Sequence, residues 1–207
     1  MTDDLESEKG KEIKVILLGN SGVGKTSIIN RYIYNKFDQN SETTLGSTYF
    51  TKEIEKNKDL YKLNLWDTTG QEKYRSITNL FIKGAQIVIL VYSVDLLSSF
   101  EGLDYWYKSI KEILQGNNFV LAVVGSKSDL IKDEDEVISE EEARQFAKDR
   151  KAKFKLVSSK EDPEGINNLF ESLLNELIRL NFVTVSTSYI IKRKKHKDKE
   201  KKKNKCC

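Results

Sequence analysis

Eight consecutive residues near the N-terminus combine glycine, lysine and threonine at a spacing that can bind phosphate. Residues 19–26, Gly-Asn-Ser-Gly-Val-Gly-Lys-Thr, fit the pattern G-x-x-x-x-G-K-[ST], in which backbone N–H groups face phosphate oxygens, the lysine neutralises their charge and the hydroxyl binds Mg²⁺. The four fixed positions should match by chance in roughly 1% of chains of this length. A phosphorylated ligand with a magnesium ion is therefore the first expectation.

The residues on either side of this segment, called here the phosphate loop, predict the elements that must hold it. Residues 13–18 form a continuous apolar run typical of a buried strand, and residues 27–34 repeat apolar side chains at helical spacing. A loop that leaves a strand and enters a helix also places the positive end of the helix dipole at the anion site. The residues expected to contact the nucleotide phosphates are Ser21, Gly22, Val23, Gly24, Lys25, Thr26 and Ser27.

A second group of chemically useful residues follows 41 positions after Thr26. Residues 66–72, Trp-Asp-Thr-Thr-Gly-Gln-Glu, stand at the end of another predicted strand. Asp67 can join the Mg²⁺ sphere, Gly70 can offer an N–H to a terminal phosphate, and Gln71 can orient an attacking water. A lone D-x-x-G is also typical of an ordinary turn, so this interpretation depends on the phosphate loop at the same sheet edge.

The remaining apolar pattern predicts an α/β fold. Further buried strands are expected at residues 87–94, 119–125 and 154–157, and each is followed by a helical pattern. Ser98, Ser139 and Asp162 are expected to cap the helices that follow them, with Pro163 at the first position of the last helix. The apolar stripe of that last helix is interpreted as core packing.

Residues 50–65 differ, because their apolar side chains alternate across the turn-prone segment 56–59. This pattern predicts a β-hairpin and an antiparallel edge strand. We therefore expect a mostly parallel six-stranded sheet with one antiparallel edge strand and helices on both faces, as in P-loop NTPases. Ligands in such sheets bind beyond the carboxyl ends of the strands, where the phosphate loop lies.

Length and composition indicate one domain with terminal extensions. The chain has 207 residues, of which 38% are hydrophobic, and it has no apolar run long enough to span a bilayer and no signal-peptide pattern. We expect a cytosolic protein with a disordered segment at 1–11, a domain at 12–180 and a flexible tail at 181–207. Both cysteines are the last two residues, so no disulfide or cysteine-based metal site is expected in the domain.

The positive charge is confined to the tail. Residues 192–205 hold ten Lys or Arg against two acids, a net +8 by count, so the chain's total of +3 leaves −5 for the rest. The globular part is mildly acidic, and nucleic-acid binding by the domain is not expected.

These motifs together resemble the small GTPases of the Ras superfamily, and among them the Rab proteins. The resemblance covers about residues 12–180. It rests on the phosphate loop, 44–46 (Thr-Leu-Gly), 66–72, 127–129 (Lys-Ser-Asp) and 158–160 (Ser-Ser-Lys), with Rab character at 62–67, 74–78, 83–85 and the terminal Cys-Cys.

The resemblance implies roles for two residues in the loop after the first helix. Thr44 would give Mg²⁺ a second hydroxyl and would contact the γ-phosphate, so residues 38–48 would order only with GTP. Phe37 would lie edge-on against guanine. By sequence alone Thr44 could instead be a surface threonine and Phe37 a core residue at a helix end.

The resemblance also implies a guanine site. The carboxylate of Asp129 can accept hydrogen bonds from the N1–H and 2-amino groups of guanine, a pair that adenine lacks. Lys127 would pack along the base, and the loop at Ser158, Ser159 and Lys160 would meet the guanine oxygen. Ser126 replaces the asparagine of the family pattern and is shorter, which predicts faster nucleotide exchange. Thr69, Ser93 and residues 45–49 also depart from that pattern.

The expected function is a slow GTPase that switches between GTP and GDP forms in membrane traffic. The resemblance implies an exchange factor, a GTPase-activating protein, effectors, Rab escort protein and GDP-dissociation inhibitor as partners. It also implies geranylgeranylation of Cys206 and Cys207, which with the basic segment would hold the protein on an intracellular membrane. The alternatives are a nucleotide-bound scaffold with little hydrolysis and a P-loop kinase of small substrates.

Overall fold

The computed structural model describes residues 7–39, 44, 47–68, 75–131, 138–183 and 187–191, with backbone alone at 7–9, 75–78 and 187–191. The strands are β1 (Ser7–Leu18), β2 (Thr48–Lys56), β3 (Asp59–Asp67), β4 (Ile87–Ser93), β5 (Val120–Ser126), β6 (Lys153–Val157) and β7 (Thr187–Ile191). The helices are α1 (Lys25–Tyr34), α2 (Arg75–Ile82), α3 (Leu97–Glu101), α4 (Leu103–Ile113), α5 (Glu140–Asp149) and α6 (Pro163–Arg179), with a 3₁₀ turn, η2, at Ser128–Leu130.

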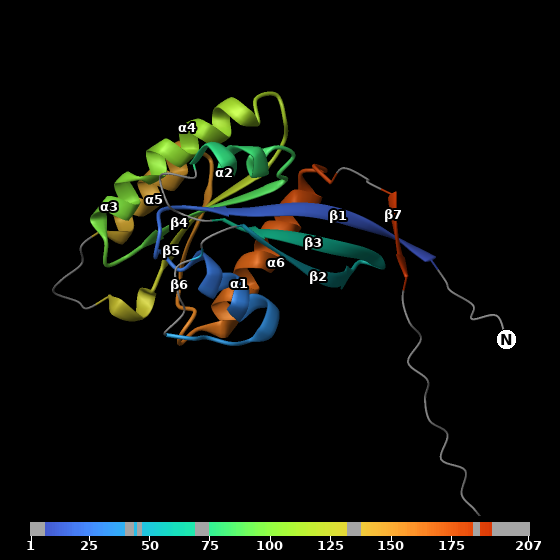
Figure 1. The fold of residues 1–207 in the computed structure, drawn as a ribbon, viewed down its shortest axis with the longest axis horizontal. Helices are drawn as coiled ribbons and strands as arrows, with labels where there is room; N and C mark the ends of the chain where they lie inside the picture. Colours follow the sequence, from blue (N-terminus) through green and yellow to red (C-terminus); the bar gives the residue numbers. More distant parts are fainter. Residues whose placement is uncertain are drawn as a thin grey trace, which may run out of the picture.

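A mixed sheet forms the centre of the molecule (Figure 1). Its order is β2-β3-β1-β4-β5-β6; β2 pairs with β3 in antiparallel fashion and the neighbouring strands from β3 to β6 are parallel. Helices α1 and α6 pack on one face, and α2 to α5 pack on the other, each over its own cluster of buried apolar side chains. The expected six-stranded sheet with helices on both faces is confirmed.

The predicted hairpin joins β2 and β3 through a two-residue turn. Asn57 and Lys58 have φ of 54° and 68°, the left-handed pair of a type I′ turn, whose twist matches that of the strands it joins. Tyr61, Leu63 and Leu65 of β3 are buried at every second position. The hairpin therefore places Asp67 at the carboxyl end of β3.

A seventh strand, β7, extends the sheet beyond the expected fold. It pairs antiparallel with the first residues of β1, from Ser7↔Ile191 to Lys11↔Thr187, and Figure 1 shows it crossing the start of β1. Residues 7–11 and 187–191 are thus strands, so the expectation of disorder at 1–11 and of a flexible tail throughout 181–207 is wrong for these segments. Neither segment has a clear strand pattern in its own sequence. Their backbone hydrogen bonds come from pairing between the two chain ends.

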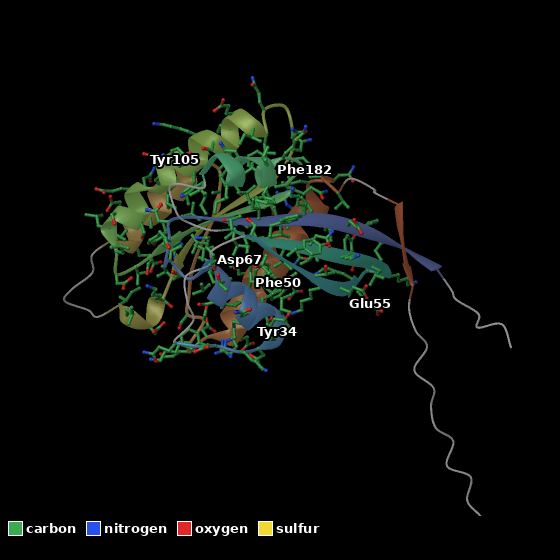
Figure 2. All side chains as sticks on the ribbon, in the orientation of Figure 1. Tyr34, Phe50, Glu55, Asp67, Tyr105 and Phe182 are labelled. Atoms are coloured by element: carbon green, nitrogen blue, oxygen red, sulfur yellow. The ribbon has the colours of Figure 1, made fainter. Side chains whose placement is uncertain are left out.

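Gln86 anchors the chain between α6 and β7 to the sheet. This buried side chain accepts from Lys14 N (3.3 Å) and donates to Phe182 O (3.2 Å). Phe182 and Val183 pack against the core on the α6 side, and Figure 2 labels Phe182 close to the C-terminal end of α6. The segment after α6 therefore begins as part of the domain.

Two of the three predicted helix caps are confirmed. Ser139 Oγ accepts from Glu142 N at the start of α5, and Asp162 Oδ1 accepts from Gly165 N at the start of α6, where Pro163 follows the cap. The expected cap at Ser98 is wrong, because the helix begins earlier and Ser98 lies inside α3.

Candidate functional site

The phosphate loop lies between β1 and α1, at the edge where the carboxyl ends of the parallel strands meet. Gly19, with φ of 151°, passes so close to β4 that an added Cβ would stand 2.1 Å from Val91 O. Gly24 has φ of 89° and starts α1 without a side-chain cap. The first N–H groups of α1 therefore point into the site uncapped, which favours an anion there.

Lys25 is held inside the phosphate loop. Its Nζ donates to Gly19 O (2.9 Å) and Asn20 O (2.8 Å), and the residue is only 5% exposed. Burial lowers the pKa of the Lys25 ammonium to about 8, partly opposed by the negative charge of Asp67. A buried cation fixed by two carbonyl oxygens is suited to neutralise a phosphate that enters the loop.

Three oxygen-bearing side chains meet beside Lys25. Thr26 Oγ1 lies 2.7 Å from Asp67 Oδ2 and 2.7 Å from Thr44 Oγ1, and Figure 2 labels Asp67 within this region. Burial raises the pKa of the Asp67 carboxyl, and among the described residues Asp67 Oδ1 is buried with no hydrogen-bond partner. An unpaired buried carboxylate oxygen beside two hydroxyls fits Mg²⁺, which needs few protein ligands and keeps several waters.

Thr68 fixes the strand end that carries Asp67. Its hydroxyl donates to Leu17 O (2.7 Å), and the residue is 1% exposed. The bond ties β3 to β1 one residue before the segment that contains Gly70 and Gln71. These two predicted residues lie outside the described part of the chain, as do Cys206 and Cys207.

A cleft of about 320 Å³ extends from the phosphate loop, and Thr26, Thr44 and Asp67 are not among its lining residues. It collects residues from four separate segments, which the sequence places far apart. The cleft, called here the base cleft, is lined by Gly22, Gly24, Ser27, Phe37, Asp38, Gln39, Ser126, Lys127, Asp129, Leu130, Ser159 and Lys160.

The structure thus brings together nine of the residues predicted to bind the nucleotide. Val23 contributes backbone alone, since its side chain is fully buried in the core. Ser21 is half-buried in the phosphate loop and does not line the cleft. Lys127 Nζ lies 3.7 Å from Asp95 Oδ1, an ion pair that the sequence did not predict.

Asp129 is oriented by the loop that follows β6. Ser158 Oγ donates to Asp129 Oδ1. Ser158 Oγ also accepts from Lys160 N (3.2 Å) and Glu161 N (3.0 Å). Ser158 is 2% exposed. The hydroxyl therefore fixes one oxygen of a carboxylate that lines the cleft, and Oδ2 takes no part in this bond.

Ser126 reaches the phosphate loop in spite of its short side chain. Its Oγ lies 2.5 Å from Val23 O and 2.8 Å from Tyr92 O. A hydroxyl has one proton, so it can donate to only one of these carbonyl oxygens at a time. Ser126 therefore contacts the phosphate loop, but it has one donor for two carbonyl oxygens.

We expect Ser126→Asn to slow nucleotide release about three- to tenfold, because an amide has two N–H donors for the two carbonyl oxygens. Ser126→Ala, which has none, should release nucleotide faster than the wild type. The dissociation rate of a fluorescent GDP analogue measures both effects. Equal rates in the wild type and the two variants would show that the donors at position 126 do not control nucleotide release.

Two residues that sequence reasoning missed support the site from outside. Asn20 donates to Ser98 O (3.2 Å) and accepts from Trp106 Nε1 (3.4 Å), which holds the phosphate loop against α3 and α4. Arg31 of α1 donates to Ser159 O and Lys160 O beside the base cleft. Their partners lie 78 to 129 positions away in the chain, so no local pattern could have revealed them.

Comparison with known proteins identifies the family. The Ras family model matches residues 14–179. Ras-related protein RABG3b of Arabidopsis thaliana is 39% identical over 141 residues, covering 67% of this chain and 70% of its own. GTP-binding protein ypt3 of Schizosaccharomyces pombe is 34% identical over 175 residues (84% and 80%), and Ras-like GTP-binding protein RYL2 of Yarrowia lipolytica is 31% identical over 208 residues (95% and 98%). The chain therefore belongs to the Ras family and is a Rab-like small GTPase.

Proposed function

We propose that the protein is a GTP/GDP switch that hydrolyses GTP slowly and recruits effectors in its GTP form. One observation carries the proposal: Thr44, from the segment between α1 and β2, has its hydroxyl 2.7 Å from that of Thr26 in the phosphate loop. A residue outside the phosphate loop thus reaches Thr26, which together with Asp67 is a proposed ligand of Mg²⁺. Contacts made there with a γ-phosphate would be lost on hydrolysis, which is how such segments switch.

The base cleft supports guanine as the base. Asp129 presents a carboxylate held by Ser158, and Phe37 and Lys127 line the same cleft. The carboxylate can accept two hydrogen bonds from guanine, whereas adenine would leave it without a donor. The backbone of Ser159 and Lys160 is the proposed contact for the guanine oxygen.

In the proposed reaction, water attacks the γ-phosphorus and GDP is the leaving group. Lys25 places its buried charge between the β- and γ-phosphates, the N–H groups at the start of α1 bind phosphate oxygens, and Gln71 orients the water. Thr26, Thr44 and Asp67 would hold Mg²⁺, which supplies charge neutralisation at the β- and γ-phosphates when bound. The intrinsic rate is expected to be about 10⁻⁴ to 10⁻² per second, with an arginine supplied by an activating protein.

Replacement of Gln71 with leucine tests the assignment of the water-orienting residue. The variant should keep nucleotide but lose hydrolysis about tenfold or more, since leucine cannot hydrogen-bond the water. Single-turnover phosphate release from protein preloaded with GTP measures the effect. Wild-type hydrolysis in this variant would refute the role of Gln71.

The same assay separates the switch from a second candidate, a guanine-nucleotide-bound scaffold with little hydrolysis. Ser126, with one donor for two carbonyl oxygens, favours a looser site of that kind. Lys25 and Asp67, both in place at the phosphate loop, favour the enzyme. Phosphate release by the wild type, with and without an activating protein, decides between them.

We also propose that the protein acts in membrane traffic at the cytoplasmic face of an intracellular membrane. No helix among the residues the structure describes has the length and apolar character needed to cross a bilayer. Prenylation of Cys206 and Cys207 would provide two lipid chains, which stable anchoring requires, and the basic segment 192–205 would add attraction to anionic lipid. Exchange factor, GTPase-activating protein, effectors, Rab escort protein and GDP-dissociation inhibitor are the proposed partners.

A further inference from the structure

The guanidinium of Arg31 joins the two segments that flank the base cleft. Its Nε donates to Ser159 O (2.6 Å) and its Nη2 to Lys160 O (3.3 Å). Its Nη1 donates to Asn35 O (3.0 Å) and Asn35 Oδ1 (3.2 Å). Four contacts from one planar group fix the 158–160 loop and the end of α1 relative to each other.

Both of these segments carry residues of the base cleft. The 158–160 loop contains Ser158, which orients Asp129, and its next two residues line the cleft. Asn35 has left-handed backbone angles, φ 52° and ψ 37°, and ends α1 two residues before Phe37. Arg31 is therefore placed to control the width of the cleft without lining it.

The helix that carries Arg31 also carries the phosphate site. Lys25 and Thr26 form the first turn of α1, and Arg31 lies in its last turn. The hydrogen bonds of Arg31 bring this last turn next to the chain that follows β6. One helix thus connects the phosphate loop to both segments that flank the base cleft.

We propose that Arg31 is a positioning residue for the guanine base, setting how firmly the base is held and hence how long the nucleotide stays bound. This inference rests on the proposed guanine-nucleotide function and concerns the same site. A lysine would retain the charge, but its three donors share one nitrogen atom and lack the planar fork with which the guanidinium spans the 158–160 loop and Asn35.

The test compares Arg31→Gln and Arg31→Lys with the wild-type full chain. We expect GDP to dissociate about tenfold faster from both variants, because each loses the fork of hydrogen bonds. IDP lacks the 2-amino group that is proposed to donate a hydrogen bond to Asp129. The preference for GDP over IDP should therefore shrink in both variants. Hydrolysis of GTP that is already bound should stay within about twofold, since the groups around the γ-phosphate are untouched.

Arg150→Gln is the matched control. Arg150 also donates to a backbone carbonyl, Phe146 O, and to a carboxylate, Asp104, but far from the base cleft. Thermal unfolding with excess GDP shows how much each variant loses in stability. Faster GDP release with an unchanged GDP/IDP ratio, or equal acceleration in Arg150→Gln, would assign Arg31 a general structural role and overturn the proposal.

The outcome for Arg31→Lys is decisive in its own right. Wild-type release by this variant would mean that charge alone suffices, and would overturn the positioning role of the fork. Failure of the wild-type chain itself to bind GDP would overturn the proposed function and this inference with it. If the wild type binds GDP and the Arg31 variants release it at the wild-type rate, this inference alone would be overturned.

Discussion

Asp129→Asn is expected to transfer the base preference of the protein from guanine to xanthine nucleotides. The asparagine oxygen can still accept from the N1–H of either base, but its NH₂ group would face the 2-amino group of guanine, donor against donor. The C2 oxygen of xanthine accepts from that NH₂ instead. Buried hydrogen-bond mismatches in sites of this kind change preference by about 10⁴ or more.

The competition of GDP and XDP for a fluorescent nucleotide on each protein measures this change. Asp38→Asn is the matched control, because Asp38 is a second carboxylate that lines the base cleft. We expect the control to keep its preference for GDP. Guanine preference in Asp129→Asn would remove Asp129 from base recognition and leave the choice of base to the backbone of the 158–160 loop.

Lys25→Met should weaken GDP and GTP binding by at least about 10³. Methionine keeps the apolar stem but removes a charge that is 5% exposed and whose pKa burial lowers to about 8. Loss of one partner from a buried, charge-assisted contact costs 2–5 kcal/mol or more. The nucleotide-free protein should unfold at nearly the same temperature, because relief from burying the ammonium offsets its two hydrogen bonds to carbonyl oxygens.

Nucleotide content after purification and titration with fluorescent GDP give the affinity, and calorimetry without nucleotide gives the unfolding temperature. Lys14→Met is the control: burial also lowers the pKa of Lys14, which lies on β1 and donates to Lys83 O. This variant should bind nucleotide as the wild type does. Tight GDP binding by Lys25→Met would exclude Lys25 as the phosphate-neutralising group.

Features that depend on local sequence could be predicted. The phosphate loop, the hairpin across residues 56–59, the caps at Ser139 and Asp162 and the buried strands each follow from residues within a few positions of one another. Motif spacing, read together with the family resemblance, also placed Thr26, Thr44 and Asp67 at one site, and the structure confirms that these three meet.

Features that depend on contacts between distant segments could not be predicted. Arg31 and Asn20 act on carbonyl oxygens and side chains at remote positions, and a surface arginine or a loop asparagine has no local pattern that indicates such a partner. The pairing of residues 7–11 with residues 187–191 could not be predicted for the same reason, since the hydrogen-bond partner of each segment lies at the other end of the chain. The contact of Ser126 with Val23 O has the same character, because it depends on how closely β5 approaches the phosphate loop.

The pairing of β7 with the start of β1 has a consequence for the distance between the domain and a membrane. If the tail left the domain at residue 181, about 25 residues would separate it from Cys206; from Ile191 the separation is about 15, or roughly 50 Å fully extended. The connection between the domain and Cys206 is thus shortened by about two fifths. It is also attached at the end of β1 opposite the phosphate loop, about 40 Å away along a 12-residue strand, so under the proposed lipidation the nucleotide would face the cytosol and its regulators.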